Sequence, residues 1–336
     1  MSASDIGELR RLTAEVLGHQ GLHGILVGLM MELVEILERS AEFQVKPKAE
    51  VKEGEIRSGG GLAISPSQAA LCAEDPTRTA VFLRGVHEAI SKALASRKHT
   101  GTPVHVLYAG SGPYATLCVP LMTLFPADEV RFTILDLHEV AIQSVKAVVH
   151  RLQLDSSVTS YVVADACEYV IPEGETPDVI VSETMDAALD SEPQVAIMRH
   201  LSGQAPDAHL VPESVQVDAY LLDTSTEPGR IEPDREDSIP ESSPNRIPLG
   251  PAAAIQSWAE LTGDRLPAGT VVIPQNPDPS YQPYLFTTIV VQGRHVLRTH
   301  DCGLTSPRAF PILEKGKLPT DDEVQFHYRL GPSPGL

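Results

Sequence analysis

Short runs of β-branched residues alternate with helix-like segments between residues 104 and 182, and this alternation constrains the fold more than any other feature. The strand-like runs are residues 104–108, 131–135, 160–164 and 178–182, and helix-like segments such as residues 139–152 separate them. Strands and helices joined by short links form βαβ units, whose strands lie parallel in one sheet. The sequence therefore predicts an α/β fold with a doubly wound parallel sheet.

The N-terminal part follows a helical pattern instead. Apolar side chains recur at three- to four-residue spacing over residues 6–39, which predicts an amphipathic helical extension broken near Gly18, Gly21 and Gly24. Its apolar face could cover the core or a second subunit, and we expect a homodimer. Residues 52–61 have the composition of a linker, and a second helical region is predicted over residues 67–96.

The C-terminal part loses the strand and helix alternation. Residues 223–251 are rich in Pro, Ser, Glu and Asp, which predicts a surface loop that could act as a lid. A short helix is predicted at residues 252–261, and antiparallel strands at residues 285–291, 295–299 and 324–330. The predicted organisation is a helical extension in residues 1–58, an α/β domain in residues 62–223 and a small β-rich domain in residues 224–336.

The amino-acid composition excludes some classes of binding partner. The formal charge of −19, from 45 acidic and 26 basic residues, argues against a nucleic-acid partner. The four cysteines form no CxxC pair, so neither a disulfide framework nor a metal site is expected, and a cytoplasmic location fits. The chain lacks a basic segment at its start, and charged residues interrupt the apolar residues 22–37, so we expect no secretion signal and no membrane partner.

A glycine turn follows the first predicted strand. Gly110, Ser111 and Gly112 there allow the backbone to approach a nucleoside or a pyrophosphate. Asp136 ends the second strand and can accept both hydroxyls of a ribose, although these two features also describe NAD-binding folds. At the end of the third strand, Asp165 and the backbone amide of Ala166 can hydrogen-bond the edge of an adenine. Each aspartate alone could instead cap a following helix.

Two glutamates follow the fourth predicted strand. The carboxyl end of that strand faces the ligand crevice of a doubly wound sheet, which places Glu183 beside a bound cofactor. Glu192, nine residues later, can return across a short loop. Two converging carboxylates repel each other unless a cation lies between them, and a planar guanidinium with five N–H donors suits such a pair. A solvated acidic loop is the alternative interpretation.

In this order the motifs resemble those of class I S-adenosylmethionine (SAM)-dependent methyltransferases, and the acidic loop resembles the double-E loop of the protein arginine N-methyltransferases. Met185 and Leu189 also stand at positions that this family uses. Tyr114 replaces the usual third glycine of the turn, Thr184 the usual tryptophan and Asp186 the usual glycine. The resemblance implies a Rossmann-like class I methyltransferase sheet, an N-methyltransferase of the EC 2.1.1 class, SAM as cofactor with S-adenosyl-L-homocysteine (SAH) as product, and no metal.

The resemblance also assigns roles to residues. It implies that Glu183 and Glu192 are catalytic and, together with Met185, bind the substrate. Residues 75–79 match a family pattern whose arginine, here Arg78, binds the methionine carboxylate of SAM. The cofactor residues implied are Arg78, Gly110, Ser111, Gly112, Asp136, Leu137, Asp165 and Ala166. Residues 299–301 keep two of three residues of a family Thr-His-Trp motif, so His300 is a candidate for binding substrate or accepting a proton, or is an ordinary surface histidine.

The resemblance covers about residues 66–223, and the C-terminal part is shorter than the family's barrel, which favours a small acceptor. In its overall plan the chain is similar to the free L-arginine N-methyltransferases of N-nitrosourea (streptozotocin-type) natural-product, or antibiotic, biosynthesis. The product would then be Nω-methyl-L-arginine, and Arg294, Arg298 and Arg308 are available for the α-carboxylate of the substrate. A protein-arginine or other small-molecule methyltransferase, and a nonenzymatic or dinucleotide-binding Rossmann-like protein, are the alternatives.

Overall fold

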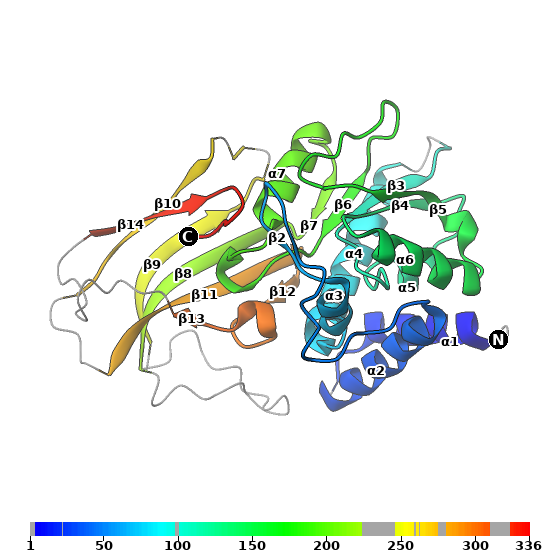
Figure 1. The fold of residues 1–336 in the computed structure, drawn as a ribbon, viewed down its shortest axis with the longest axis horizontal. Helices are drawn as coiled ribbons and strands as arrows, with labels where there is room; N and C mark the ends of the chain where they lie inside the picture. The colour runs from blue at the N-terminus through cyan, green and yellow to red at the C-terminus, as the bar shows by residue number, and fades with distance from the viewer. Residues whose placement is uncertain are drawn as a thin grey trace.

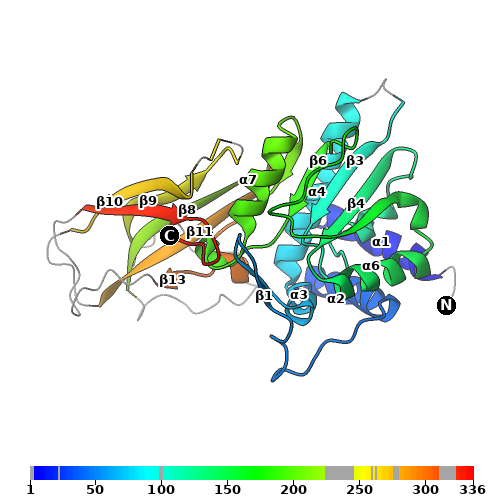
Figure 2. The ribbon, with the colours of Figure 1, turned by 45° about the horizontal axis from the view of Figure 1, so that its top comes forward.

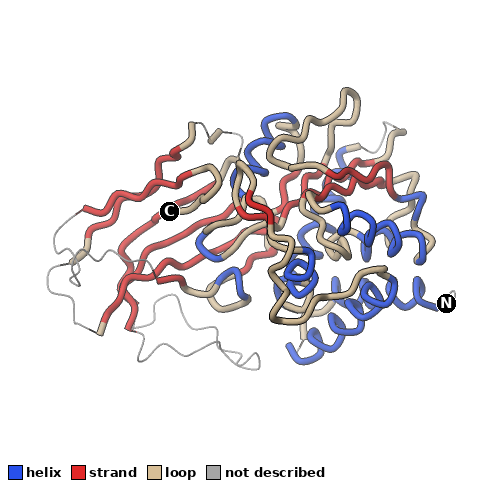
Figure 3. The backbone as a smooth tube through the Cα atoms, viewed as in Figure 1, coloured by secondary structure: helices blue, strands red, loops and turns tan. Residues whose placement is uncertain are grey.

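The computed structural model describes residues 4–21, 23–97, 101–223, 246–258, 260–261, 263–274, 280–309 and 323–336. It has two halves, one built from a parallel sheet with helices around it and one made mostly of antiparallel strands (Figures 1 and 3). The N-terminal helices lie along the lower side of the helical half in Figure 1, and the C-terminus lies within the strand half. Within the described residues, no helix has both the length and the apolar character needed to cross a membrane.

The first half contains a five-stranded parallel sheet with the order β5-β4-β3-β6-β7. Its strands are β3 (Val104–Ala109), β4 (Val130–Asp136), β5 (Val158–Val163), β6 (Val179–Ser182) and β7 (His209–Val211). The chain runs outward from β3 through β4 to β5 and then returns to the other side of β3, so the winding reverses between β3 and β6. Ligands of open α/β sheets bind beside the carboxyl ends of the strands at such a reversal. The predicted Rossmann-like α/β class is confirmed.

Helices cover this sheet, and they are α4 (Pro76–Ser96), α5 (Val119–Met122), α6 (Glu139–Arg151) and α7 (Gln194–Gln204). Helix α6 packs on β4 and β5, α7 packs on β6, and α4 packs on β3, β6 and β7. The Asp75 side chain begins α4 by accepting a hydrogen bond from the Arg78 N–H at 3.1 Å. Val106, Ile134 and Val181 are fully buried, as expected for parallel strands that are covered on both faces.

The N-terminal extension forms the two predicted helices, α1 (Ser4–Gly18) and α2 (His23–Ser40). They pack on each other and on α4, α5 and α6, with Leu12 and Leu33 fully buried. Arg84 of α4 ties them to the sheet, since its Nη2 donates to the Val16 and His19 carbonyls at 2.8 and 3.0 Å. The apolar face of the extension therefore covers the core of its own chain, and the homodimer stays a prediction.

Antiparallel strands make up the second half (Figure 2). They are β8 (Ser214–Asp223), β9 (Arg246–Ile255), β10 (Arg265–Val272), β11 (Tyr281–Gln292), β12 (His295–Leu297), β13 (Arg308–Ala309) and β14 (Glu323–Arg329). One sheet has the order β12-β11-β8-β9 with β13 paired to β11, while β10 pairs with β14. Strand β8 thus belongs to this half, which begins before the predicted domain boundary at residue 223. The predicted antiparallel strands are confirmed, and α4 joins the halves by packing on β11 and β12.

Two predictions between residues 223 and 261 are wrong where the structure describes them. Residues 252–255 of the predicted helix belong to β9, in which Ala253 pairs with Val217 and Ile255 with Val215 of β8. This pairing buries Ala253 and Ile255, and such tertiary contacts override the helix propensity of alanine. The predicted surface loop gives way to β9 at residue 246, and residues 224–245, which would form the lid, lie outside the described residues.

The predicted linker is a hairpin. Strand β1 (Ile56–Arg57) pairs with β2 (Leu62–Ala63), and α3 (Pro66–Cys72) follows. The Leu62 N–H donates to the Ser191 carbonyl at 2.8 Å, and Arg57 Nη1 donates to the Pro332 carbonyl at 2.6 Å. Gly61 has a φ of +148°, and a Cβ there would lie 2.9 Å from the Ser191 carbonyl oxygen, so glycine allows this close approach. The hairpin therefore lies directly against the loop that follows β6.

Candidate active site

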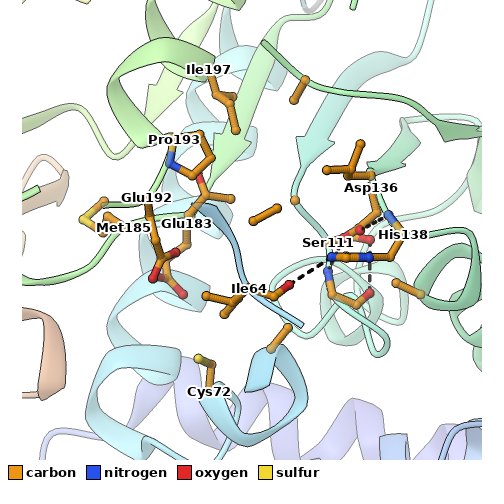
Figure 4. Close-up of a pocket in the computed structure, with 18 of the residues that line it drawn as sticks. Ile64, Cys72, Ser111, Asp136, His138, Glu183, Met185, Glu192, Pro193 and Ile197 are labelled. Carbon is orange, nitrogen blue, oxygen red and sulfur yellow. Dashed lines mark hydrogen bonds between the residues drawn. The ribbon is translucent and has the colours of Figure 1, made fainter. Parts of the chain in front are cut away.

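One cavity of about 310 Å³ lies at the carboxyl ends of β3, β4 and β6, where the winding reverses. Figure 4 shows Ser111, Asp136 and His138 at one side of it and Glu183, Glu192 and Met185 at the other. Of the residues predicted for cofactor and substrate, the structure gathers the following eleven around this cavity: Arg78, Gly110, Ser111, Gly112, Asp136, Leu137, Asp165, Ala166, Glu183, Met185 and Glu192. The remaining one, His300, is not among the lining residues and lies in the turn before η3 (Gly303–Thr305).

Asp136 organises one side of the cavity. Its Oδ2 accepts a hydrogen bond from the Gly112 N–H and its Oδ1 one from the His138 N–H, both at 2.8 Å. Burial raises the pKa of Asp136, against these two hydrogen bonds, which lower it. His138 Nε2 lies 3.0 Å from the Ile64 carbonyl oxygen, which ties this side to the segment after β2. The Asp136 carboxylate is thus held in place at the end of β4, where it could accept hydrogen bonds from the two hydroxyls of a ribose.

Asp165 and Ala166 follow β5 at the same edge of the sheet. Asp165 Oδ1 accepts a hydrogen bond from the Cys167 N–H at 2.8 Å, so this aspartate does cap the turn that follows its strand. Both residues nevertheless line the cavity. The capping contact and the ligand-binding role are compatible because a carboxylate has about four lone-pair sites.

Thr184, at the place of the expected tryptophan, fills the space beneath the glycine turn. Its N–H donates to Gln194 Oε1 at 2.8 Å, and its Oγ1 lies within hydrogen-bond distance of Gln194 Oε1 and Ser182 Oγ, both at 3.1 Å. Gln194 is fully buried and also donates to the Ser182 carbonyl at 3.2 Å. Gly110 has a φ of +77°, and a Cβ there would lie 2.3 Å from Thr184 Cγ2. The turn and the loop after β6 are therefore packed directly against each other.

Gly110→Ala is expected to destabilise the protein by about 1–3 kcal/mol, because it adds both a left-handed alanine and a clash with a threonine that its hydrogen bonds hold in place. Thermal unfolding monitored by circular dichroism measures the effect. Thr184→Ser removes the clashing methyl group, so adding it to Gly110→Ala should restore part of the lost melting temperature. A double variant no more stable than Gly110→Ala would show that the clash is not the cause.

Glu183 and Arg78 form an ion pair at the other side of the cavity. Arg78 Nη1 lies 3.8 Å from Glu183 Oε2, and the two side chains are 10% and 15% exposed. Burial raises the pKa of Glu183 to about 7, against the charge of Arg78, which lowers it. Burial lowers the pKa of Arg78, but the charges of Glu183, Cys72 and Asp75 outweigh it and raise that pKa. Arg78 Nη2 also donates to the Cys72 carbonyl, which fixes the guanidinium in place.

Glu192 is the second carboxylate here, and its surroundings are more acidic. Burial and the charges of Glu183 and Asp186 raise the pKa of Glu192 to about 8, while Arg78 lowers it. Near neutral pH the two glutamates therefore do not both carry a full charge unless a cation approaches them. The two glutamates are therefore suited to bind a cation, whose arrival would make them release protons.

Replacing Glu192 by glutamine is expected to raise the free energy of unfolding above pH 8 by up to about 5 kcal/mol, at about 1.4 kcal/mol for each pKa unit. A carboxyl group whose pKa is raised in the folded protein binds more protons than in the unfolded chain, so the wild type loses stability as pH rises from about 4.5 to 8. Glutamine removes that loss. Urea unfolding at pH 5 and pH 9 tests it, and a stability gain that is equal at both pH values would contradict this explanation.

The loop that carries both glutamates has a strained backbone. Ala188, Leu189 and Ser191 have φ values of 60°, 58° and 64°, in the left-handed region that residues other than glycine rarely occupy. Such conformations cost of order 1 kcal/mol each and persist only where the surrounding structure imposes them. The loop geometry is therefore imposed by its contacts.

Those contacts come from the hairpin and from the strand half. The Ala188 N–H donates to Thr287 Oγ1 at 2.9 Å, and Tyr328 Oη donates to the Leu189 carbonyl at 2.9 Å. The Ser191 N–H donates to the Pro334 carbonyl at 3.0 Å, while the Ser191 carbonyl accepts from Leu62. Strands β11 and β14, the C-terminal residues and β2 thus hold the glutamates in position.

Sequence reasoning missed several lining residues. The β2 segment contributes Leu62, Ala63 and Ile64, and the turn after His300 contributes Gly303 and Leu304. Gly59, Gly60 and Gly61 were the available signal for a close approach, although they equally suit a linker. Among the described residues, no group of three His, Cys, Asp or Glu side chains is arranged to hold a metal ion.

No family model matches the sequence, and no curated protein matches it. Among solved structures, the chain is similar to the PRMT1 enzyme–prozyme heterotetrameric complex of Trypanosoma brucei with AdoHcy, at 13% identity and a TM-score of 0.41, over 74% of this chain and 84% of that chain. A likeness this low carries no conclusion about function. The fold is identified from the strand order of this chain, and the site from its own side chains.

Proposed function

We propose that the chain is a SAM-dependent N-methyltransferase whose acceptor is the guanidinium of free L-arginine and whose product is Nω-methyl-L-arginine. The observation that supports this most strongly is the presence of Glu183 and Glu192 on one side of a cavity whose other side carries Asp136 and the glycine turn. A nucleoside site and a pair of carboxylates that needs a cation thus face each other. The role in natural-product biosynthesis is supported by the resemblance of the sequence alone.

The residues present fit SAM. Asp136 would hold the ribose hydroxyls, and Asp165 with the Ala166 amide would hold the adenine edge. The buried Arg78 would bind the methionine carboxylate through its fork of N–H donors. Gly110, Ser111 and Gly112 line the cavity, so the backbone of the turn could approach the cofactor closely. When bound, SAM supplies a methyl group activated by its sulfonium.

Glu183 and Glu192 would orient and polarise the acceptor. Resonance spreads the guanidinium lone pairs into its π-system, and a pKa above 12 makes prior deprotonation costly. Carboxylates bound to the N–H groups of the other nitrogens localise the positive charge there, which leaves the remaining nitrogen more nucleophilic. Fixing that nitrogen in line with the bond that breaks is the larger part of the rate gain.

The transfer balances in atoms and charge. A bond would form between the acceptor nitrogen and the methyl carbon that SAM would supply, while the sulfur–methyl bond would break and leave its electron pair on the sulfur. The methylated nitrogen, which would otherwise carry a second positive charge, would then lose one proton to a carboxylate of the glutamate pair, from which solvent would take it up. His300 is not needed for this step, and its part in substrate binding stays a prediction.

The experiment that tests the proposal offers purified protein and SAM two acceptors in parallel, free L-arginine and an arginine-rich peptide, and identifies products by mass spectrometry. Methylation of free arginine alone is expected. Methylation of the peptide alone would favour a protein-arginine methyltransferase, and no transfer to either acceptor would contradict the guanidinium assignment. Thermal stabilisation by SAM but not by NAD⁺ would separately exclude the dinucleotide-binding alternative, since ligand at 100 times its Kd adds about 2.7 kcal/mol.

A further inference from the structure

An ion pair lies beside the two glutamates. Asp186, which lines the cavity, is paired through its Oδ2 with Nη2 of Arg308 on β13. Asp186 is also close enough to Glu192 for its charge to raise the pKa of that carboxyl group. The pair thus adds one basic and one acidic group next to the place where a guanidinium would bind.

Both side chains of this ion pair remain accessible to a ligand. The Arg308 and Asp186 side chains are 45% and 39% exposed, so each has N–H or oxygen sites left for a ligand. The other two arginines available from the sequence lie elsewhere: Arg294 in the turn between β11 and β12, where its charge lowers the pKa of Glu88 on α4, and Arg298 shortly after β12. Arg308 contacts a cavity-lining residue, Asp186.

A free amino acid differs from an arginine within a protein by its two head-group charges. The α-carboxylate needs a cationic partner and the α-ammonium an anionic one, and charge-assisted hydrogen bonds to such groups are about twice as strong as neutral ones. An arginine beside an aspartate offers both. An arginine within a peptide has neither an α-carboxylate nor an α-ammonium charge, so the Arg308–Asp186 pair would have no charged group of such a substrate to bind.

The ion pair and the glutamates belong to one loop. Asp186 is three residues after Glu183, so their backbones lie at most about 11 Å apart, and both residues line the same cavity. An arginine has three methylene groups between its α-carbon and its guanidinium nitrogen, which gives it a length of the same order. We expect its guanidinium to lie at the glutamates while its head group contacts the ion pair.

We propose, resting on the guanidinium methyltransferase proposed above, that the Arg308–Asp186 pair binds the head group of free L-arginine, with Arg308 on the α-carboxylate and Asp186 on the α-ammonium. The pair then determines specificity for a free amino acid over a protein.

The test compares kcat/KM for L-arginine and for agmatine, which has the same guanidinium side chain and amine but no carboxylate. Wild type is expected to prefer L-arginine by about 10- to 100-fold. Arg308→Ala should lower that ratio at least tenfold, mainly through the KM for L-arginine, and Arg308→Lys should give an intermediate ratio because it keeps the charge but loses the fork. Arg294→Ala, which removes a cation from the turn at the other end of β11, is the matched control and should keep the wild-type ratio.

Asp186→Asn tests the other half of the pair. It should reduce the preference for L-arginine over Nα-acetyl-L-arginine, whose amine carries no charge. Each variant is first checked for wild-type melting temperature and SAM affinity. The inference is overturned if wild type uses agmatine as well as L-arginine, or if Arg308→Ala lowers kcat/KM for both alike. The absence of turnover on every one of these guanidines is a different result, which rejects the proposed function and this inference with it.

Discussion

Glu183→Gln is expected to lower kcat/KM for L-arginine roughly 1,000-fold, because a neutral amide cannot localise the guanidinium charge while the methyl group is transferred. The side chain keeps its size and is only 15% exposed, so the change is confined to charge and hydrogen bonding. Glu192→Gln should show a loss of similar size. Steady-state kinetics with SAM saturating measures both.

Two controls separate this loss from damage to the fold. SAM affinity should stay within a few-fold of wild type in both variants, since the proposed ribose and adenine contacts come from Asp136 and Asp165. Asp190→Asn removes an exposed carboxylate from the same loop and should leave turnover unchanged. Substantial activity in both glutamine variants would mean that the carboxylates do not act on the acceptor.

Arg78→Ala is expected to weaken SAM binding roughly 100-fold, the size expected when a buried charge-assisted hydrogen bond to a carboxylate is lost. The variant should also raise the pKa of Glu183 above about 7, because the charge of Arg78 holds it down. Any rise of kcat/KM with pH should therefore move to higher pH. Calorimetric titration with SAM and a pH series of initial rates measure the two effects.

Arg78→Lys keeps a charge near Glu183 but loses the guanidinium fork, so its pH profile should stay closer to wild type than its SAM affinity does. Lys92→Ala removes a cation from the far end of the same helix and is the matched control. If Arg78→Ala binds SAM as wild type does, Arg78 serves the fold or Glu183 and not the cofactor.

Much of the first half could be predicted from the sequence because its signals are local. Each strand of the parallel sheet is a short apolar run, and the residues that follow β3, β4, β5 and β6 must lie together once those strands lie parallel. Predicting the strands therefore also predicted that Gly110, Asp136, Asp165 and Glu183 lie at the same edge of the sheet, and all four line one cavity.

The features that the sequence did not reveal depend on contacts between distant segments. The β1–β2 hairpin is too short to show periodicity, and its conformation follows from its contact with Ser191. Residues 252–255 favour a helix locally but pair with β8. Likewise, Arg308 could not be told from Arg294 and Arg298, because its partner Asp186 lies 122 positions away.

The most direct test of the central claim, that two carboxylates in this cavity bind a guanidinium, is calorimetric titration of L-arginine into the SAH complex at pH 7, in buffers of different ionisation enthalpy. Because the pKa values of Glu183 and Glu192 are about 7 and 8 in the free site, a cation that binds between them should lower both and release protons. We predict arginine binding with proton release, and loss of both in the Glu183→Gln/Glu192→Gln variant. Binding that is absent, or that is the same in the double variant, would contradict the claim.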